Sequence, residues 1–319
     1  MSVLPEPSTI REAQRLLAGY FGPTPLVKAT SLSTPAADVF LKIETALPTA
    51  SFKPRGALYA LAINLQRRKI EEVTASSTGN HGAATAFAAR ALGVRATIFL
   101  PENPNPVKRK KIEDLGAHIV CEGSIDLADA FATAKEYSRR SGVYFLNDAT
   151  DPDLPAGPGT IGLELTEQLH NISAVFVPVG DTALIRGVGS AIKQLSPQTR
   201  VIGVQAEQAP SYVLSWRAGK AVPTETCDTC ADGLATRTPE APNILAIRQV
   251  VDDVVLVSEQ QMLDAIHHLY TKENVLAEPA GAAATAAYLA NPVAGRVALL
   301  VTGANISHEV RQQAGIEVG

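Results

Sequence analysis

The sequence predicts an α/β fold with two open, mostly parallel sheets wrapped by helices. Short apolar runs rich in β-branched residues alternate with alanine- and leucine-rich segments along most of the chain. Such alternation is typical of parallel strands joined by helical crossovers. The chain has 319 residues, 46% of them hydrophobic and 19% charged, which is enough for a large core shared by two joined lobes.

The expected strands are the runs 38–44, 72–77, 95–100, 117–122, 143–146, 173–179, 200–207, 252–257 and 296–301. The alanine-rich segment 81–92 is a clear helix, because Asn80 precedes it and Gly93 follows it, where a left-handed residue would end the helix. The proline-rich segment 101–107 is expected to be a loop, since its prolines continue neither a strand nor a helix. Segment 147–159 is the best candidate crossover between the lobes.

Charge and hydropathy exclude several classes of protein. The formal charge of −4 arises from interspersed acidic and basic residues, so no surface for nucleic acid or membrane is indicated. The one basic cluster, KRKK at 108–111, is interpreted as a solvated helix face. Residues 1–14 lack the apolar run of a signal peptide, and no stretch reaches the roughly 18 apolar residues of a membrane span. We therefore expect a cytoplasmic protein without a nucleic-acid or membrane partner.

The cysteines do not indicate a disulfide framework. Three are too few for one, and Cys227 with Cys230 forms a single CxxC that lacks the second pair of a structural zinc site. A position near the active site, through the neighbouring segment 231–235, is favoured over a redox or metal role.

Four short segments carry the chemical signal: SFKPRGA at 51–57, STGNHG at 77–82, VPVGDTALIRG at 177–187 and LLVTGANI at 299–306. Their order and spacing resemble the cofactor lysine, ring loop, phosphate loop and pyridine-nitrogen segment of pyridoxal-phosphate enzymes of the tryptophan-synthase-β fold family. The threonine/serine dehydratases and serine racemases are the most similar branch. The resemblance covers residues 24–305.

That resemblance implies pyridoxal 5'-phosphate as the cofactor and a small amino acid as the substrate. It also implies a homodimer and a chain of two domains. Residues 1–73 and 150–319 would form a large cofactor-binding domain, and residues 74–149 a small domain, with the cofactor in the cleft between them.

Lys53 is the first candidate catalytic residue and the attachment point of the cofactor. A lysine amine readily forms an imine with an aldehyde, but it must first lose its proton, which burial and nearby cationic groups favour. The resemblance places Lys53 at the start of a helix, and Pro54 suits a first helical turn. Phe52 would lie beside the cofactor.

The second segment joins a strand to a helix, where backbone N–H groups and the helix dipole favour an anion. By resemblance, Asn80 meets the phenolic oxygen of the cofactor, while Ser77, Thr78, Gly79 and His81 bind the substrate carboxylate. The alternative that Asn80 only caps the helix stays open. Thr78, the second candidate catalytic residue, stands where serine racemases have the serine that acts on the opposite face of the substrate. This departure disfavours a racemase.

The phosphate loop departs from the nearly all-glycine turn of the relatives, because here it reads Gly180, Asp181, Thr182, Ala183 and Leu184. Glycines allow backbone N–H groups to converge on a phosphate. Asp181 would repel a dianion, so we expect its carboxylate to turn away or to accept backbone N–H bonds. The Thr182 hydroxyl and the following helix N-terminus would hold the phosphate. Arg186 either compensates the lost contacts or lies on the helix surface.

Three further residues complete the predicted site. Thr302 would hydrogen-bond the pyridine nitrogen, and a neutral hydroxyl suits elimination because it leaves that nitrogen largely unprotonated; a buried strand-end threonine is the alternative. Glu278 resembles a glutamate that lies near the cofactor. Glu207 resembles a divalent-metal ligand of serine racemases, but Val213 stands where its acidic partner would be, so a cation would bind weakly.

Together these features predict a lyase that removes water and then ammonia from a β-hydroxy-α-amino acid, giving a 2-oxo acid. Serine and threonine are the default substrates, and the altered phosphate loop makes 3-phenylserine, 3-hydroxyaspartate or a hydroxylated diamino acid credible. The alternatives are an amino-acid racemase and a β-replacement synthase. A non-catalytic binding protein is disfavoured by the presence of Lys53, Asn80 and Thr302.

Overall fold

The computed structural model describes residues 4–77, 79–102, 106–121, 123–125 and 127–316. It has two sheets, of six strands in the order β1-β2-β10-β7-β8-β9 and of four strands in the order β5-β4-β3-β6. Every neighbouring pair is parallel except β1 with β2. The predicted fold class is confirmed.

The strands of the larger sheet are β1 (Leu26–Lys28), β2 (Ala37–Ile43), β7 (Ile172–Pro178), β8 (Arg200–Ala206), β9 (Asp253–Val257) and β10 (Gly295–Val301). Those of the smaller sheet are β3 (Glu72–Ser76), β4 (Arg95–Phe99), β5 (His118–Val120) and β6 (Val143–Phe145). All of the expected strands are confirmed, with ends within two residues. Strand β1 was not predicted from the sequence, because three residues at an antiparallel edge are too few to show a periodicity.

The α-helices are α1 (Pro7–Leu17), α2 (Lys53–Arg67), α3 (Asn80–Leu92), α4 (Pro106–Asp114), α5 (Leu127–Tyr137), α6 (Ala156–Gln168), α7 (Ala183–Leu195), α8 (Ser211–Ala218), α9 (Ala241–Val250), α10 (Glu259–Glu273), α11 (Pro279–Ala290) and α12 (His308–Gln313). Two short 3-10 helices, η1 (Glu44–Ala46) and η2 (Asp232–Leu234), lie between them. Among the helices described, none combines the length and hydropathy needed to cross a membrane.

Two local expectations need correction. The end of segment 101–107 is helical, because α4 begins at Pro106, and proline is tolerated at the first helical position. Asn80 is not a helix cap: Gly79 precedes the first helical residue of α3, and that residue is Asn80 itself. At the other end of α3, Gly93 has φ +72°, which confirms the expected left-handed residue.

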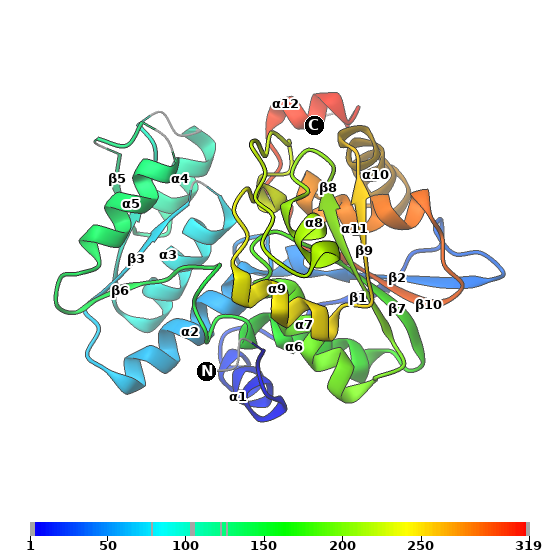
Figure 1. Ribbon diagram of the computed structural model, residues 1–319, viewed down its shortest axis with the longest axis horizontal. Helices are drawn as coiled ribbons and strands as arrows, with labels where there is room; N and C mark the ends of the chain where they lie inside the picture. Colours follow the sequence, from blue (N-terminus) through cyan, green and yellow to red (C-terminus); the bar gives the residue numbers. More distant parts are fainter. Residues whose placement is uncertain (1–3, 78, 103–105, 122, 126, 317–319) are drawn as a thin grey trace.

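Helices cover both faces of the larger sheet, and the alternation of side chains along each strand explains why. On β7, Ala174 and Phe176 pack with α10 and α11, whereas Val175 and Val177 pack with α6, α7 and α9. The smaller sheet, with α3, α4 and α5, lies to the left in Figure 1, and α2 lies between the two sheets. Both faces of the larger sheet therefore belong to hydrophobic cores.

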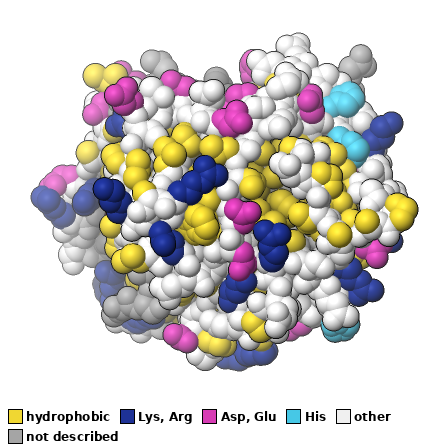
Figure 2. Space-filling model, turned by 45° about the vertical axis from the view of Figure 1, so that its right-hand side comes forward, with side chains coloured by type: hydrophobic (Ala, Val, Ile, Leu, Met, Phe, Trp, Pro, Cys, Tyr) yellow, Lys and Arg dark blue, Asp and Glu magenta, His cyan; other side chains and the backbone are white. Residues whose placement is uncertain are grey.

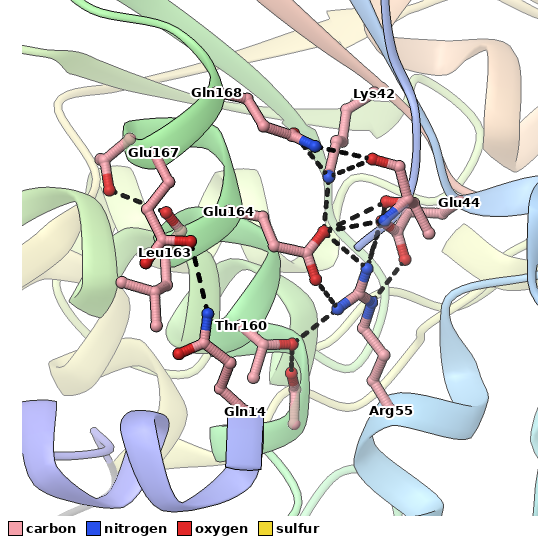
Figure 3. Close-up of polar contacts among 12 residues, drawn as sticks. Gln14, Lys42, Glu44, Arg55, Thr160, Leu163, Glu164, Glu167 and Gln168 are labelled. Carbon is pink, nitrogen blue, oxygen red and sulfur yellow. Dashed lines mark hydrogen bonds and ion pairs between the residues drawn. The ribbon is translucent and has the colours of Figure 1, made fainter. Parts of the chain in front are cut away.

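A buried group of charged side chains holds the start of α2 in place. Arg55, which is 1% exposed, bonds the carboxylates of Glu44 (Nε to Oε2, 2.7 Å) and Glu164 (Nη1 to Oε1, 2.5 Å). The Nζ of Lys42 lies 2.5 Å from Oε2 of the same Glu164. Figure 3 shows these side chains pointing toward one another from β2, η1, α2 and α6. Since a buried charge is tolerated only when paired, this group fixes how α2 lies against the larger sheet.

The surface carries charges of both signs. On the face drawn in Figure 2, Lys and Arg side chains are interspersed with Asp and Glu, and hydrophobic side chains lie between them. That view is consistent with the formal charge of −4 and its even distribution along the sequence.

Candidate active site

The four sequence segments meet at the carboxyl ends of the strands. β3 leads into the loop before α3, β7 leads into the loop before α7, and β10 leads into Thr302. The backbone N–H of Phe52 donates to the carbonyl of Thr302 at 3.0 Å, and Ser51 bridges Gly303. Ligand sites of open parallel sheets lie at this end of the strands, so the segments are brought together where a cofactor is expected.

Lys53 is confirmed as the first residue of α2, and a carboxylate contacts its amine. The Nζ of Lys53 lies 2.6 Å from Oδ2 of Asp148 and 5.6 Å from the ring centre of Phe52. Burial alone would lower the pKa of Lys53, but Asp148, Asp181 and Glu278 raise it overall. The groups that raise the pKa of this amine are carboxylates, which favour its charged form.

His81 faces the same carboxylate. Its ring is 5% exposed; Nε2 lies 2.9 Å from the carbonyl oxygen of Leu146, and Nδ1 lies 3.8 Å from Oδ2 of Asp148. Burial lowers the pKa of His81. Burial would raise the pKa of Asp148, but His81 and Lys53 hold it well below its usual range. One ring nitrogen of His81 bonds Leu146 and the other faces Asp148. We therefore expect His81 to contact a substrate carboxylate through its backbone N–H.

The rest of the loop before α3 is tightly folded. Ser77 Oγ accepts a hydrogen bond from the N–H of Gly79 at 3.2 Å, and a side chain on Gly82 would overlap the carbonyl oxygen of Ser77. Thr78, the candidate second-face residue, lies outside the described residues.

Asn80 is held by a chain of hydrogen bonds that crosses the site. Its Nδ2 donates to Oε1 of Glu278 at 2.5 Å, and its Oδ1 accepts from Nδ2 of Asn305 at 2.5 Å. The Nζ of Lys111 donates to Oδ1 of Asn305 and, at 2.8 Å, to the carbonyl of Thr49. The amide of Asn80 therefore has one orientation. The amide nitrogen has two hydrogens, and the one not used by Glu278 could reach a phenolic oxygen.

The interpretation of residues 108–111 as a solvated helix face is wrong for Lys111. Arg109 and Lys110 are exposed and pair along the helix with Glu113 and Asp114, as expected of a solvated face. Lys111 instead turns inward, and burial lowers the pKa of its amine.

Asp148, Asn305 and Lys111 were not assigned from the sequence. Asn305 lies within segment 299–306, but the sequence of that segment does not indicate that its side chain bonds Asn80. Asp148 lies in the acidic crossover segment, where no spacing relates it to Lys53.

The loop after β7 fits a phosphate group. Thr182 has φ +71° and is 2% exposed, and its hydroxyl has no hydrogen-bond partner among the described residues. A side chain on Gly180 would overlap the carbonyl oxygen of Gly233, so the backbone there is close-packed. The side chains of Ala183 and Leu184 are buried in hydrophobic clusters. A buried hydroxyl and the first N–H groups of α7, which have no intrahelical acceptor, are suitable donors to an anion.

The carboxylate of Asp181 is held by a side-chain hydroxyl. Its Oδ1 accepts a hydrogen bond from the hydroxyl of Thr236 at 3.2 Å, instead of from backbone N–H groups. Burial and then Asp148 raise the pKa of Asp181 to about 6, while Lys53 opposes that shift. The carboxylate therefore has a side-chain hydroxyl as its donor in place of the expected backbone N–H groups.

Arg186 is not on the helix surface. It is 1% exposed on α7, and Nη2 donates to the carbonyl oxygen of Ala149 at 3.2 Å. Burial lowers the pKa of Arg186 to about 10, and Asp181 and Asp148 are among the groups that oppose this shift. Arg186 is thus a buried cation of α7, in contrast to a residue of the helix surface.

Thr302 is 4% exposed at the end of β10. Its hydroxyl donates to the carbonyl oxygen of Ala280 at 3.4 Å, which is long for an O–H···O bond, so the hydroxyl is free to rotate toward a better acceptor. The N–H of Glu278 donates to the carbonyl of Gly303 at 2.9 Å, and this bond holds the start of α11 against the same loop.

Neither the metal ligand nor the cysteines join this group of residues. Glu207 is exposed beyond β8, Val213 is buried, and in the part of the chain that the structure describes no three His, Cys, Asp or Glu side chains are grouped as metal ligands. Cys227 and Cys230 are free thiols, and burial and Glu259 raise the pKa of Cys230 to about 12. Gly233, in the segment that follows the cysteines, packs against Gly180 of the loop after β7.

Known proteins resemble this chain over most of its length. A family model described as pyridoxal-phosphate dependent enzyme matches residues 17–303. The L-threonine ammonia-lyase of Thermotoga maritima is 39% identical over 300 residues, covering 93% of this chain and 75% of that protein. Maize serine racemase has a TM-score of 0.90 at 28% identity, with 97% and 96% of the two chains covered. The threonine deaminase of T.th. has a TM-score of 0.87 at 33% identity, with 95% and 99% covered.

Proposed function

The chain belongs to the pyridoxal-phosphate-dependent enzyme family, in its threonine/serine dehydratase branch, and on this premise we propose that it removes water and then ammonia from a β-hydroxy-α-amino acid. The product is a 2-oxo acid. The observation that carries the proposal is the position of Lys53 at the start of α2, where the N–H of the preceding Phe52 donates to the carbonyl of Thr302 at the end of β10. When bound, pyridoxal phosphate supplies an electron sink for the pair left behind by the α-proton.

The residues present suit that chemistry. Lys53 would attach the cofactor and then take the α-proton from the substrate on Nζ. The Thr182 hydroxyl and the N-terminus of α7 would hold the phosphate, and Asn80 would donate to the phenolic oxygen. Thr302 would donate to the ring nitrogen, and as a neutral hydroxyl it would leave that nitrogen largely unprotonated. The backbone N–H groups at the start of α3 would receive the substrate carboxylate.

The charges around Lys53 narrow the choice of substrate. Asp148, Asp181 and Glu278 all interact with the lysine amine, so a second carboxylate on the substrate would be repelled. We therefore rank 3-hydroxyaspartate below the other candidates. Serine, threonine and 3-phenylserine carry no such group, and a hydroxylated diamino acid would be attracted.

A panel of β-hydroxy amino acids tests the proposal. The yellow, cofactor-loaded protein would be incubated with each compound in deuterated buffer, and release of oxo acid and ammonia would be compared with appearance of the epimerised amino acid. We expect oxo acid from at least one neutral or cationic compound and none from the Lys53→Ala protein. Inversion faster than ammonia release would indicate a racemase instead. A panel without oxo acid would refute the lyase proposal.

A further inference from the structure

One carboxylate oxygen of Asp148 lies between the amine of Lys53 and the imidazole of His81. Its Oδ2 is 2.6 Å from Nζ of Lys53 and 3.8 Å from Nδ1 of His81. The three residues come from the start of α2, the segment after β6 and the start of α3. The ring of His81 is buried, while the side chains of Lys53 and Asp148 are 19% and 21% exposed.

The hydrogen bond to Leu146 decides which nitrogen of His81 is basic. A carbonyl oxygen can only accept, so Nε2, at 2.9 Å from it, carries the hydrogen. In the neutral ring Nδ1 then presents a lone pair to the carboxylate of Asp148. Two acceptors that face each other repel, and a proton between them would remove that repulsion. His81 is thus arranged to receive a proton on the side of Asp148.

Lys53, in contrast to His81, must lose a proton before it can react. An amine must be neutral to attach an aldehyde or to take a proton from substrate, but an ion pair with Asp148 favours the ammonium form. If the proton of Lys53 moves to His81, Asp148 keeps its charge and exchanges one cationic partner for another. The net charge of the three groups does not change.

We propose that Asp148 is a catalytic residue that shares a proton between Lys53 and His81, so that the lysine amine becomes neutral while the carboxylate stays paired. In this step an N–H bond of Lys53 breaks and its electron pair stays on Nζ. The proton passes by way of Oδ2 of Asp148 to the lone pair of Nδ1 of His81, where the new N–H bond forms. A change of about 1 Å brings Oδ2 and Nδ1 to hydrogen-bond distance.

Other charged groups also act on Lys53, Asp148 and His81, whether the shared proton is on Lys53 or on His81. Asp181, from the loop after β7, faces Asp148 and Lys53, and Arg186 of α7 faces Asp181. Glu278, at the start of α11, faces Lys53, and Asp151, from the segment of Asp148 itself, faces His81. Because they are present in both protonation states, these groups shift the pH at which the proton moves.

The inference deepens the proposed function and rests on Lys53 as the cofactor lysine, but its test needs no turnover. The full chain is stripped of cofactor, and the rate of pyridoxal-phosphate attachment is followed by absorbance as a function of pH. A shared proton keeps a constant fraction of Lys53 neutral over a range of pH, so the rate should show a plateau. In His81→Asn and Asp148→Asn the plateau should disappear, and the rate should fall about tenfold per pH unit.

Asp153→Asn is the matched control, because Asp153 lies in the same segment and pairs with Arg67 instead of Lys53. It should keep the plateau. A plateau retained in either test variant would overturn the proposal.

A second measurement covers the case in which a test variant does not fold. In the cofactor-free parent labelled with ¹⁵N-histidine, Nδ1 of His81 should be partly protonated, to a constant degree, over the pH range in which the attachment rate is constant. An Nδ1 that stays unprotonated over this range would overturn the proposal. Failure of the proposed function looks different, since attachment would then occur at a lysine other than Lys53 or no oxo acid would form.

Discussion

Replacing Arg55 with leucine should destabilise the protein far more than the same change elsewhere on α2. Arg55 is the shared cation of two buried carboxylates, on Glu44 and Glu164, and Lys42 contacts only the second of them. In Arg55→Leu the carboxylate of Glu44, which is 0% exposed, would lose the cation that contacts it. Breaking one partner out of a buried ion pair costs about 3–5 kcal/mol.

That cost converts into a measurable shift of the melting temperature. Unfolding entropy is about 2.1 cal/mol/K per residue, or about 0.7 kcal/mol/K for a chain of 319 residues. Arg55→Leu should therefore lower the Tm by about 4–7 °C in calorimetry. Arg67→Leu on the same helix is the matched control, because the side chain of Arg67 is 58% exposed and its ion pair with Asp153 is worth under about 1 kcal/mol.

The difference between the two variants should also depend on pH. Burial would raise the pKa of Glu164, but Arg55 and Lys42 lower it overall. A lowered carboxyl pKa contributes stability above the ordinary carboxyl range, and this contribution disappears as the pH falls through the lowered value. The destabilisation by Arg55→Leu should therefore shrink in acid. Equal melting temperatures for Arg55→Leu and Arg67→Leu at neutral pH would refute the argument that the buried group holds α2.

The other predictions concern the cofactor. Lys53→Ala should abolish cofactor absorbance, and borohydride reduction with peptide mapping of the parent should find the label on Lys53; a label elsewhere would contradict the assignment. Arg186→Ala should weaken cofactor binding in equilibrium dialysis by about 1.5–3 kcal/mol, because the cofactor phosphate would lose a charge-assisted bond from the guanidinium. Arg109→Ala, an exposed control, should not, and equal affinities would exclude a role for Arg186. Asp181→Asn should tighten binding about tenfold at about pH 8 but not at about pH 5, because the pKa of Asp181 is about 6. Equal tightening at both values would show that its charge is not the cause.

Features that depend on neighbours along the chain could be predicted from the sequence. The strands follow from apolar runs of the right length, and Lys53 at a helix start follows from its motif and Pro54. Gly93 is identified because a left-handed helix end favours glycine. Each of these signals is contained in a few consecutive residues, so no knowledge of the packing is needed to find it.

Contacts between distant segments could not be predicted in this way. Asp148 is 95 residues from Lys53, and Lys111 is 194 residues from Asn305. The identity of a charged residue does not reveal which charge it will meet. Asp181 is a poor phosphate ligand by its charge, and the sequence does not reveal that Thr236, 55 residues away, donates a hydrogen bond to its carboxylate. Ion pairs and hydrogen bonds act over a few ångströms, so these partners are decided by the relative placement of the two sheets, which follows from the packing of the whole chain.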